Sequence, residues 1–457
     1  MKKLIAAVAV AASAMVSSPS YGDERSAWLD YVEANANLFV NTGVIAKRGT
    51  KVEYTGTYGS PTPSSPNRDI LIGASAGGYG GNDNEWGLIR NCNQKISLAY
   101  NNATFISTDV EFPPPDDAML TIVSEVTLDG TGSSISVSGD ATGSASGTWN
   151  GPNLNYPLYL FARNAAGTAD KFSRGRCFGL KIWQVPDGGS EYVLVRDFRP
   201  CLYDGEAALY DTVNGMVYKS RSNTPFVPGP VVSDAAPDSF LEYAETQQIN
   251  GSPYLNTGIV AKRGTKFEYV GTWCKTTCQS AAGATVLGGV SGSTSSTESD
   301  YWLGRNVNSW MSASKNCNTD IAFPPDANEV FTIISEFLPN TASADSNFRF
   351  IAQSDSHSAD MTVAGPNYDT ELSMFLFCAN GENYRNRDAD GKCRSLRIWQ
   401  VPTGGSEYVL VREFRPCVAD GVVGFYDKVS QKVFLPSRGF MLPGPQVKKR
   451  GMMIIVK

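Results

Sequence analysis

Few side chains in this sequence could catalyse a reaction. His357 is the only histidine, and its neighbours in QSDSHSAD are typical of a solvated loop. A Ser-His-Asp or Cys-His mechanism needs a histidine beside the nucleophile, and the first half of the chain has none. Glycoside hydrolysis instead uses two carboxyl groups about 5–10 Å apart. Glu125 in IVSEV and Glu336 in IISEF recur at one position, but each stands alone. We therefore expect structural roles for both and no catalytic site.

Aromatic residues offer a better basis for ligand recognition. Two tryptophans, in NEWGLIRN and in DYWLGRN, are each followed three to four residues later by an Arg-Asn pair. A tryptophan face beside a guanidinium and an amide suits a sugar ring, which offers CH surface and hydroxyls. The candidate ligand-binding residues are therefore Trp86, Arg90, Asn91, Trp302, Arg305 and Asn306. The alternative is a core tryptophan beside a salt-bridged arginine. For Trp183 and Trp399, which lie in a copied segment, we expect packing roles.

The nine cysteines are interpreted as disulfide partners, because the chain starts like an exported protein and such proteins are oxidised. Two predicted bridges close a repeated hairpin, Cys177–Cys201 and Cys393–Cys417. Four further cysteines, which allow three connectivities, are Cys274, Cys278, Cys317 and Cys378. A Cys274–Cys278 bridge would stiffen a loop where the first half carries SPTPSSP, which leaves Cys317–Cys378 as the other pair. Cys92 has no evident mate.

Metal ligands are not grouped at a recognisable spacing. A zinc set of Cys274, Cys278, Cys317 and His357 is the alternative to disulfides, but its spacing is irregular. DADG at 388–391 resembles half of a calcium loop, whereas the first half has FSRG at the matching place. We therefore expect no cofactor, with calcium as an alternative that no clear motif supports.

The start of the chain predicts export. MKKLIAAVAVAASAMVSSPSYG combines a basic tip, an apolar run and small residues, which is the pattern of a secretory signal peptide over residues 1–22. Its removal would take away two lysines and no acid, so the net charge would change from −6 to −8. An acidic chain argues against a nucleic-acid partner, and no later apolar stretch reaches the length of a membrane span. The expected location is secreted or in the cell envelope.

The remaining chain contains one unit twice. RCFGLKIWQVPDGGSEYVLVRDFRPC (176–201) returns as KCRSLRIWQVPTGGSEYVLVREFRPC (392–417) with 20 of 26 letters unchanged. NTGVIAKRGTKVEY returns as NTGIVAKRGTKFEY, and the closing FVPGP returns as MLPGP, in the same order. The predicted organisation is a signal peptide (1–22), a first domain (23–230), a short linker (231–239), a second domain (240–447) and a tail (448–457).

Each copy has the texture of an all-β domain. TKVEYTGTY and TKFEYVGTW alternate polar with apolar residues, and Gly, Pro, Asn and Ser recur at short intervals. Many short strands over about 200 residues predict a two-sheet sandwich.

The copied segment predicts an antiparallel hairpin that turns at PDGGSE. Centring it on Gly189 places Cys177 opposite Cys201, Lys181 opposite Asp197, Leu180 opposite Phe198 and Trp183 opposite Val195. In the second copy the same register places Cys393 opposite Cys417 and Arg397 opposite Glu413. The unlike charges change together between the copies, as opposed cross-strand pairs do.

The order of these motifs resembles a known family. An NTG near the start, then G-x-x-x-x-L-x-I-W, LVRDFRPC, GEAALYDTVNGMVY and PGP are similar to the laminin-G-like, concanavalin A-like domains of exported bacterial proteins. The resemblance covers nearly all of each copy, with GVVGFYDKVSQKVF as the matching element in the second. It implies two tandem jelly-roll β-sandwiches, similar in fold to lectins and to sandwich glycosidases.

The expected function is binding without catalysis. We expect an exported protein that recognises a glycan or a cell-surface glycoconjugate, or that mediates surface adhesion, because duplicated weak sites gain by avidity. A carbohydrate-active hydrolase with a dispersed acid pair is the first alternative, and a purely structural envelope protein is the second. The sequence does not specify the oligomeric state.

Overall fold

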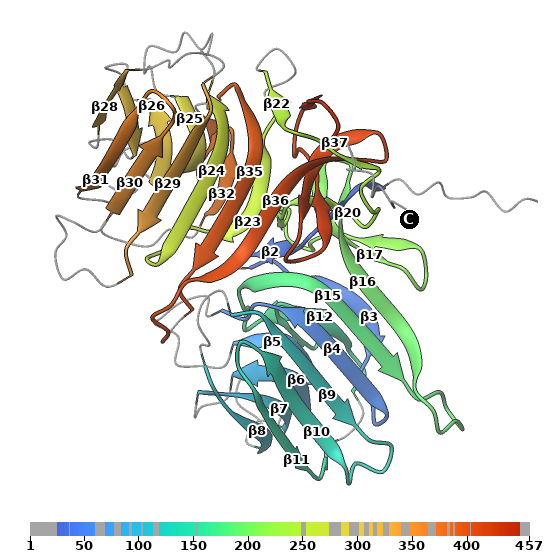
Figure 1. The fold of residues 1–457 in the computed structure, drawn as a ribbon. Helices are drawn as coiled ribbons and strands as arrows, with labels where there is room; N and C mark the ends of the chain where they lie inside the picture. Colours follow the sequence, from blue (N-terminus) through green and yellow to red (C-terminus); the bar gives the residue numbers. More distant parts are fainter. Residues whose placement is uncertain are drawn as a thin grey trace, which may run out of the picture.

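The computed structural model describes residues 25–447, except 36, 60–68, 77–83, 91–93, 102–103, 113–117, 152–153, 248–252, 274–284, 292–300, 306–309, 314–317, 323–328, 340–347, 364–371, 382–383, 387–388 and 403. Every regular element in this described part is a β-strand (Figure 1). The all-β fold expected from the alternating sequence is therefore confirmed. The described chain contains no helix long and apolar enough to cross a membrane.

The strands form one large sheet and two smaller ones. The first half contributes to the large sheet β1 (Arg25–Leu29), β2 (Val32–Ala34), β4 (Thr50–Gly56), β9 (Leu120–Val126), β10 (Ser133–Gly139), β11 (Gly143–Gly147), β15 (Gly175–Gln184), β16 (Val193–Tyr203), β17 (Glu206–Asp211), β18 (Met216–Tyr218), β19 (Val227–Pro228) and β20 (Val231–Ser233). The second half contributes β21 (Ser239–Phe240), β22 (Ala244–Thr246), β24 (Thr265–Trp273), β29 (Phe331–Phe337), β30 (Phe348–Gln353), β31 (Ser358–Val363), β35 (Gly391–Gln400), β36 (Val409–Ala419), β37 (Val422–Asp427), β38 (Lys432–Phe434) and β39 (Leu442–Pro443).

Each half adds one smaller sheet of eight strands. The first comprises β3 (Val40–Ile45), β5 (Ile70–Ser75), β6 (Asn84–Arg90), β7 (Lys95–Asn101), β8 (Thr104–Glu111), β12 (Pro157–Leu160), β13 (Arg163–Ala165) and β14 (Thr168–Asp170). The second comprises β23 (Leu255–Val260), β25 (Thr285–Ser291), β26 (Tyr301–Arg305), β27 (Trp310–Ala313), β28 (Asn318–Ala322), β32 (Ser373–Leu376), β33 (Ala379–Gly381) and β34 (Tyr384–Asn386).

Two hydrophobic cores lie between these sheets. The first joins residues of the large sheet, such as Val52 and Leu180, with residues of the first small sheet, such as Leu88. The second joins Phe267 with Leu287 in the same way. Strands β4 and β24 show why the alternating sequence forms these layers, because every second residue of each is buried. Each half is thus a two-layer β-sandwich.

The large sheet runs through both halves. β20 pairs with β1 on one side and with β38 of the second half on the other, with Val232 opposite Phe434. Residues 231–239, expected to be a linker, therefore contain β20 and the start of β21. Figure 1 shows the blue-to-green and the yellow-to-red strands meeting beside β20. The two cores are joined by main-chain pairing as well as by the connecting segment.

The predicted hairpin forms, but its predicted register holds for only part of its length. Lys181 lies opposite Asp197 and Leu180 opposite Phe198, as expected, and Arg397 lies opposite Glu413. The expected pairing of Trp183 with Val195 is wrong. A β-bulge after Ile182 shifts the ladder, so that Trp183 lies opposite Leu194.

The structure corrects the hairpin disulfides. Cys177, Cys393 and Cys417 carry free, buried thiols, so neither the Cys177–Cys201 nor the Cys393–Cys417 bridge is present. Beyond Leu180 the two strands of the hairpin separate, and the N-terminal segment inserts between them. Cys177 then lies opposite Val32 of β2, whereas Cys201 lies opposite Trp28 of β1. In the second half, Cys393 and Cys417 likewise lie opposite β22 and β21.

The other predicted bridge partners lie mostly outside the described residues. These are Cys274, Cys278, Cys317 and the unmated Cys92. Cys378 is described and is buried in the second half.

Candidate functional site

The tryptophan-centred binding sites predicted from the sequence are not supported where the structure describes them. Trp86 is 1 % exposed and belongs to the first core, so its ring cannot serve as a platform for a sugar. It was misassigned because a core tryptophan on a strand produces the same local sequence as a surface one. The backbones of Arg90, Trp302 and Arg305 lie in β6 and β26. Asn91 and Asn306 lie outside the described residues.

The isolated acids and the histidine are held in local contacts. Glu125 lies opposite Lys51 and Glu336 opposite Lys266, each pair on neighbouring strands. The Nδ1 atom of His357 lies 2.8 Å from Oε1 of Glu329, at a partly exposed position. Asp388 of the calcium-like segment lies outside the described residues. No group of three metal-ligating side chains occurs among the residues that the structure describes.

An open groove of about 610 Å³ lies on the first half. Strand β3, the loop after it and the β15–β16 hairpin form its walls. The residues that line it are Gly43, Val44, Ile45, Lys47, Leu154, Gln184, Asp187, Val195 and Arg196. Most of them come from segments that the sequence carries twice.

The NTG tripeptide shapes one end of this groove. Gly43 has a φ of +71°, a conformation that suits glycine. Its amide donates a hydrogen bond to Oδ1 of Asn41 (2.9 Å), and Oγ1 of Thr42 donates to the carbonyl of Leu158 (2.9 Å). A Cβ atom on Gly43 would lie 3.4 Å from Nη2 of Arg196. The glycine thus allows the guanidinium to lie against the main chain.

Arg196 is anchored from behind. Its Nε donates to the carbonyl of Thr42 (3.1 Å) and its Nη1 to the carbonyl of Val195 (2.7 Å). Oδ2 of Asp211, a fully buried residue, lies 3.4 Å from Nε. No carboxylate is recorded at Nη2 among the described residues. A fixed guanidinium with one side turned to the groove is suited to bind an anion, because its planar donors match a carboxylate.

The other groove residues supply mixed chemistry. Gln184 donates from Nε2 to the carbonyl of Ile45 (2.7 Å). Lys47 forms an ion pair with Asp187 at 2.6 Å, and this hydrogen bond lowers the pKa of the Asp187 carboxyl. Val44 and Leu154 add buried apolar surface.

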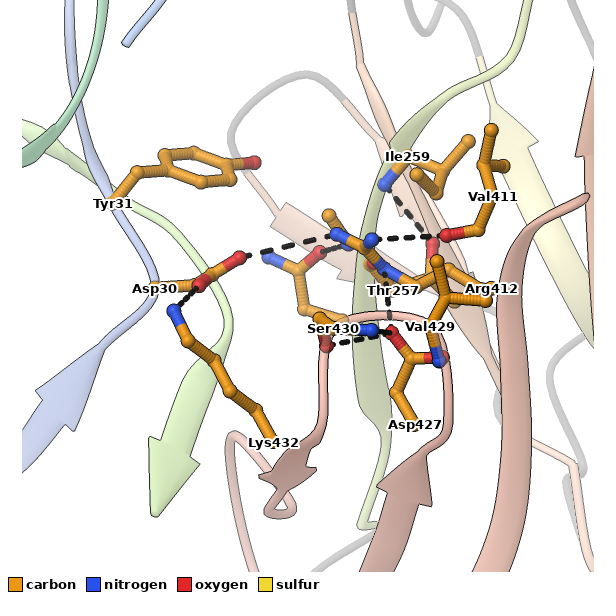
Figure 2. A network of polar contacts seen from close by, with 12 residues as sticks. Asp30, Tyr31, Thr257, Ile259, Val411, Arg412, Asp427, Val429, Ser430 and Lys432 are labelled. Carbon is orange, nitrogen blue, oxygen red and sulfur yellow. Dashed lines mark hydrogen bonds and ion pairs between the residues drawn. The ribbon is translucent and has the colours of Figure 1, made fainter. Parts of the chain in front are cut away.

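The second half contains the same arginine site, and there it is occupied. Arg412 is held by the same kind of bonds as Arg196, with Nε donating to the carbonyl of Thr257 (3.3 Å) and Nη1 to that of Val411 (3.0 Å) (Figure 2). Oδ2 of Asp427 lies 3.7 Å from Nε. On its outer side, Nη2 lies 3.9 Å from Oδ2 of Asp30, which belongs to the first half. The chain itself therefore places a carboxylate on this arginine.

Asp30 is fixed from both halves. Its Oδ1 accepts a hydrogen bond from Nζ of Lys432 at 2.6 Å, and its amide donates to the carbonyl of Pro230 at 2.8 Å. Pro230 lies over Gly258, the counterpart of Gly43, where a Cβ atom would approach Pro230 Cγ to 3.0 Å. The same NTG and arginine geometry is thus filled by the chain in the second half and open in the first.

Comparison with known proteins leaves the family open. No family model matches the chain, and no curated protein matches it. Among solved structures it is similar to domains LG4-5 of the mouse laminin alpha1 chain, with 12 % identity, 85 % of this chain and 91 % of that chain covered, and a TM-score of 0.29. It is also similar to a mutant of the NanB sialidase from Streptococcus pneumoniae, with 9 % identity, 90 % and 74 % coverage, and a TM-score of 0.25. Similarity this low carries nothing about function.

The arginine site was missed in the sequence although its signals are present. Arg196 and Arg412 stand in LVRDF and LVREF, Asp211 and Asp427 in LYD and FYD, and both copies carry NTG. What the repeats do not show is that Asp30 covers only one of the two arginines, because that contact depends on how the halves pack.

Proposed function

We propose that this protein is an exported, non-catalytic binding protein that attaches to acidic saccharides through the groove of its first half. One observation carries the proposal. Nη2 of Arg412 lies 3.9 Å from the carboxylate of Asp30, which also accepts a hydrogen bond from Lys432 at 2.6 Å. Arg196, anchored by the same backbone bonds as Arg412, faces an open groove. A site already built to hold a carboxylate in one copy is a candidate for binding one in the other.

The remaining lining supports a sugar acid rather than a small inorganic anion. A groove of about 610 Å³ has room for a saccharide unit or more. The exposed side chain of Ile45 suits the CH face of a ring, and the amide of Gln184 and the charges of Lys47 and Asp187 lie where hydroxyls could bond. A single-site affinity would be modest, which agrees with a role in adhesion to a surface that carries many copies of the ligand.

The test is titration of the purified chain with an oligouronate, with a neutral oligosaccharide of equal length as the ligand control. The oligouronate should bind and the neutral sugar should bind much more weakly. Arg196→Gln should weaken binding roughly 10- to 100-fold, the value of a charged hydrogen-bonded contact. Because Arg196 also contacts Asp211, a second variant is needed that leaves this anchor intact.

Ile45→Asp provides that variant. Ile45 is 44 % exposed at the groove, so a carboxylate there repels an acidic ligand without entering the core. Leu128→Asp is the matched control, since Leu128 is 47 % exposed but does not line the groove. Equal loss of binding in both variants, or equal binding of neutral and acidic sugars, would refute the proposed site. Release of reducing ends during the titration would indicate a hydrolase instead.

A further inference from the structure

The contact between the two halves is made by a corner of the first half. This first corner comprises Trp28, Asp30, Pro230 and Val232. Strand pairing places Trp28 opposite Val232, and the amide of Asp30 donates to the carbonyl of Pro230 at 2.8 Å. Val232 is 3 % exposed and belongs to the core of the second half, and Trp28 packs against that core. The corner is therefore held together by its own main-chain bonds and packs against the core of the second half.

The surface that receives it is equally compact. This second socket comprises Gly258, Arg412, Lys432 and Phe434. Pro230 lies over Gly258, Asp30 forms ion pairs with Arg412 and Lys432, and Val232 pairs with Phe434 across the β20–β38 ladder. The contact thus combines a carboxylate–guanidinium pair, apolar packing and main-chain pairing.

The second half carries its own copy of the corner, and it is exposed. This second corner comprises Phe240, Glu242, Pro445 and Val447, the counterparts of the first corner in order. Its internal bonds are the same, because the amide of Glu242 donates to the carbonyl of Pro445 (2.8 Å) and that of Val447 to the carbonyl of Phe240 (2.8 Å). All four residues are exposed, and Val447 is 51 % exposed where Val232 is 3 % exposed.

The first half carries the matching socket, and it is open. This first socket comprises Gly43, Arg196, Met216 and Tyr218. Met216 is exposed and Tyr218 is half-buried. Of their counterparts, Phe434 is buried opposite Val232, and Lys432 is half-exposed and donates a hydrogen bond to Asp30. Strand β18 pairs with β17 on one side, and no partner on its other side occurs in the described chain. Its counterpart β38 pairs on both sides.

We infer that the protein associates head to tail with a second copy of itself, the second corner of one copy docking in the first socket of the next. The contact repeats between molecules the one already present inside each molecule. Glu242 would bind Arg196 as Asp30 binds Arg412, Pro445 would lie over Gly43, and Val447 would pair with β18. Exposed strand edges of this kind readily accept another strand.

The contact is heterologous, because two different surfaces meet. Such contacts build open chains unless a ring closes, so each added copy would extend the large sheet and leave one socket free at the end. The socket shares Gly43 and Arg196 with the saccharide groove, so a docked copy and an acidic saccharide would exclude each other. The proposed association does not depend on saccharide binding, so either proposal can be refuted without refuting the other.

The first test compares two exposed valines of the purified full chain. In sedimentation velocity experiments, the sedimentation coefficient of the wild-type chain should rise with protein concentration and exceed that of a dimer. Val447→Asp should abolish it, because a charge enters the apolar part of the corner. Val409→Asp is the matched control, since Val409 is also 51 % exposed but lies outside both corners and both sockets. Circular dichroism establishes that both variants are folded.

The second test is charge complementation. Glu242→Arg alone and Arg196→Glu alone should each weaken association roughly tenfold or more, because like charges then meet in the contact. An equimolar mixture should recover it, since every corner then finds a socket of opposite charge on the other variant. This recovery also excludes misfolding as the cause of the single-variant losses.

Three results would overturn the inference. They are a wild-type chain that stays monomeric up to its solubility limit, equal effects of Val447→Asp and Val409→Asp, and a mixture that remains as dissociated as its components. Saccharide binding is measured separately on Glu242→Arg, which keeps an intact groove. Loss of association with binding retained, or the reverse, therefore shows which of the two proposals fails.

Discussion

Neutralising Asp30 should weaken the contact between the two halves, whereas neutralising its repeat counterpart should not. Asp30→Asn and Glu242→Gln each remove one carboxylate charge at the same place in the repeated unit and keep the side-chain size. Asp30 is 5 % exposed and bound by Lys432 and Arg412 of the other half. Glu242 is exposed on the second corner. Comparing the two variants therefore isolates the contribution of the contact between the two halves.

The expected loss of unfolding free energy depends on how deeply the ion-pair partners of Asp30 are buried. Removing one member of a fully buried ion pair costs about 3–5 kcal/mol, whereas an exposed pair contributes at most about 1 kcal/mol. Lys432 is half-exposed and regains water when Asp30 is neutral, whereas Arg412 is 15 % exposed and keeps Asp427 at 3.7 Å. An intermediate loss of about 2 kcal/mol is expected for Asp30→Asn. For Glu242→Gln we expect a change within about 0.5 kcal/mol.

Urea unfolding, followed by tryptophan fluorescence and circular dichroism, measures the difference. Protein concentrations should be low enough to keep the chain monomeric, since association would add apparent stability. Asp30→Asn should lower the urea midpoint of the transition that separates the halves, and the two probes should diverge if the halves then unfold independently. The reasoning is refuted if Glu242→Gln loses as much stability as Asp30→Asn, or if Asp30→Asn changes nothing.

Three further outcomes are expected. Burial raises the pKa of the Cys177 thiol to about 12. Cys177 should therefore stay protonated and unreactive toward Ellman's reagent at pH 8 until the chain unfolds. The stability linked to this thiol is present below its unfolded pKa and is lost as the pH rises toward 12. Rapid labelling of Cys177 itself in the native chain, located among the nine cysteines by peptide mass mapping, would contradict this. Gly258→Ala should destabilise the chain more than Gly43→Ala, by about 1 kcal/mol. Both glycines have a positive φ, but only Gly258 lies under a proline ring. Equal urea midpoints for the two variants would contradict this expectation. An oligouronate should shift the sedimentation of associated wild-type chain toward monomer, whereas a neutral oligosaccharide should not, and an equal response to both would exclude competition at Arg196.

Local pairing could be predicted from the copied segment with good accuracy. Lys181–Asp197 and Arg397–Glu413 changed together between the copies, and such pairs report directly on cross-strand neighbours. The prediction failed beyond Leu180, where β1 and β2 enter between the strands. Nothing in the hairpin sequence signals an insertion from residues about 150 positions earlier. The cysteine prediction failed for this reason, since it extended the register to the point where the strands separate.

The candidate site divides in the same way. The repeat itself determines the arginine, the NTG turn and the buried aspartate, because each depends on contacts within one copy that both copies share. The sequence also determines the all-β fold, through alternation that buries one face of each strand. Which arginine is covered depends on where Asp30 lies after the halves pack, and a repeated sequence treats both copies alike. Only the tertiary structure could show one socket filled and one open, because a chain with two copies in sequence has one internal junction and leaves two unmatched ends.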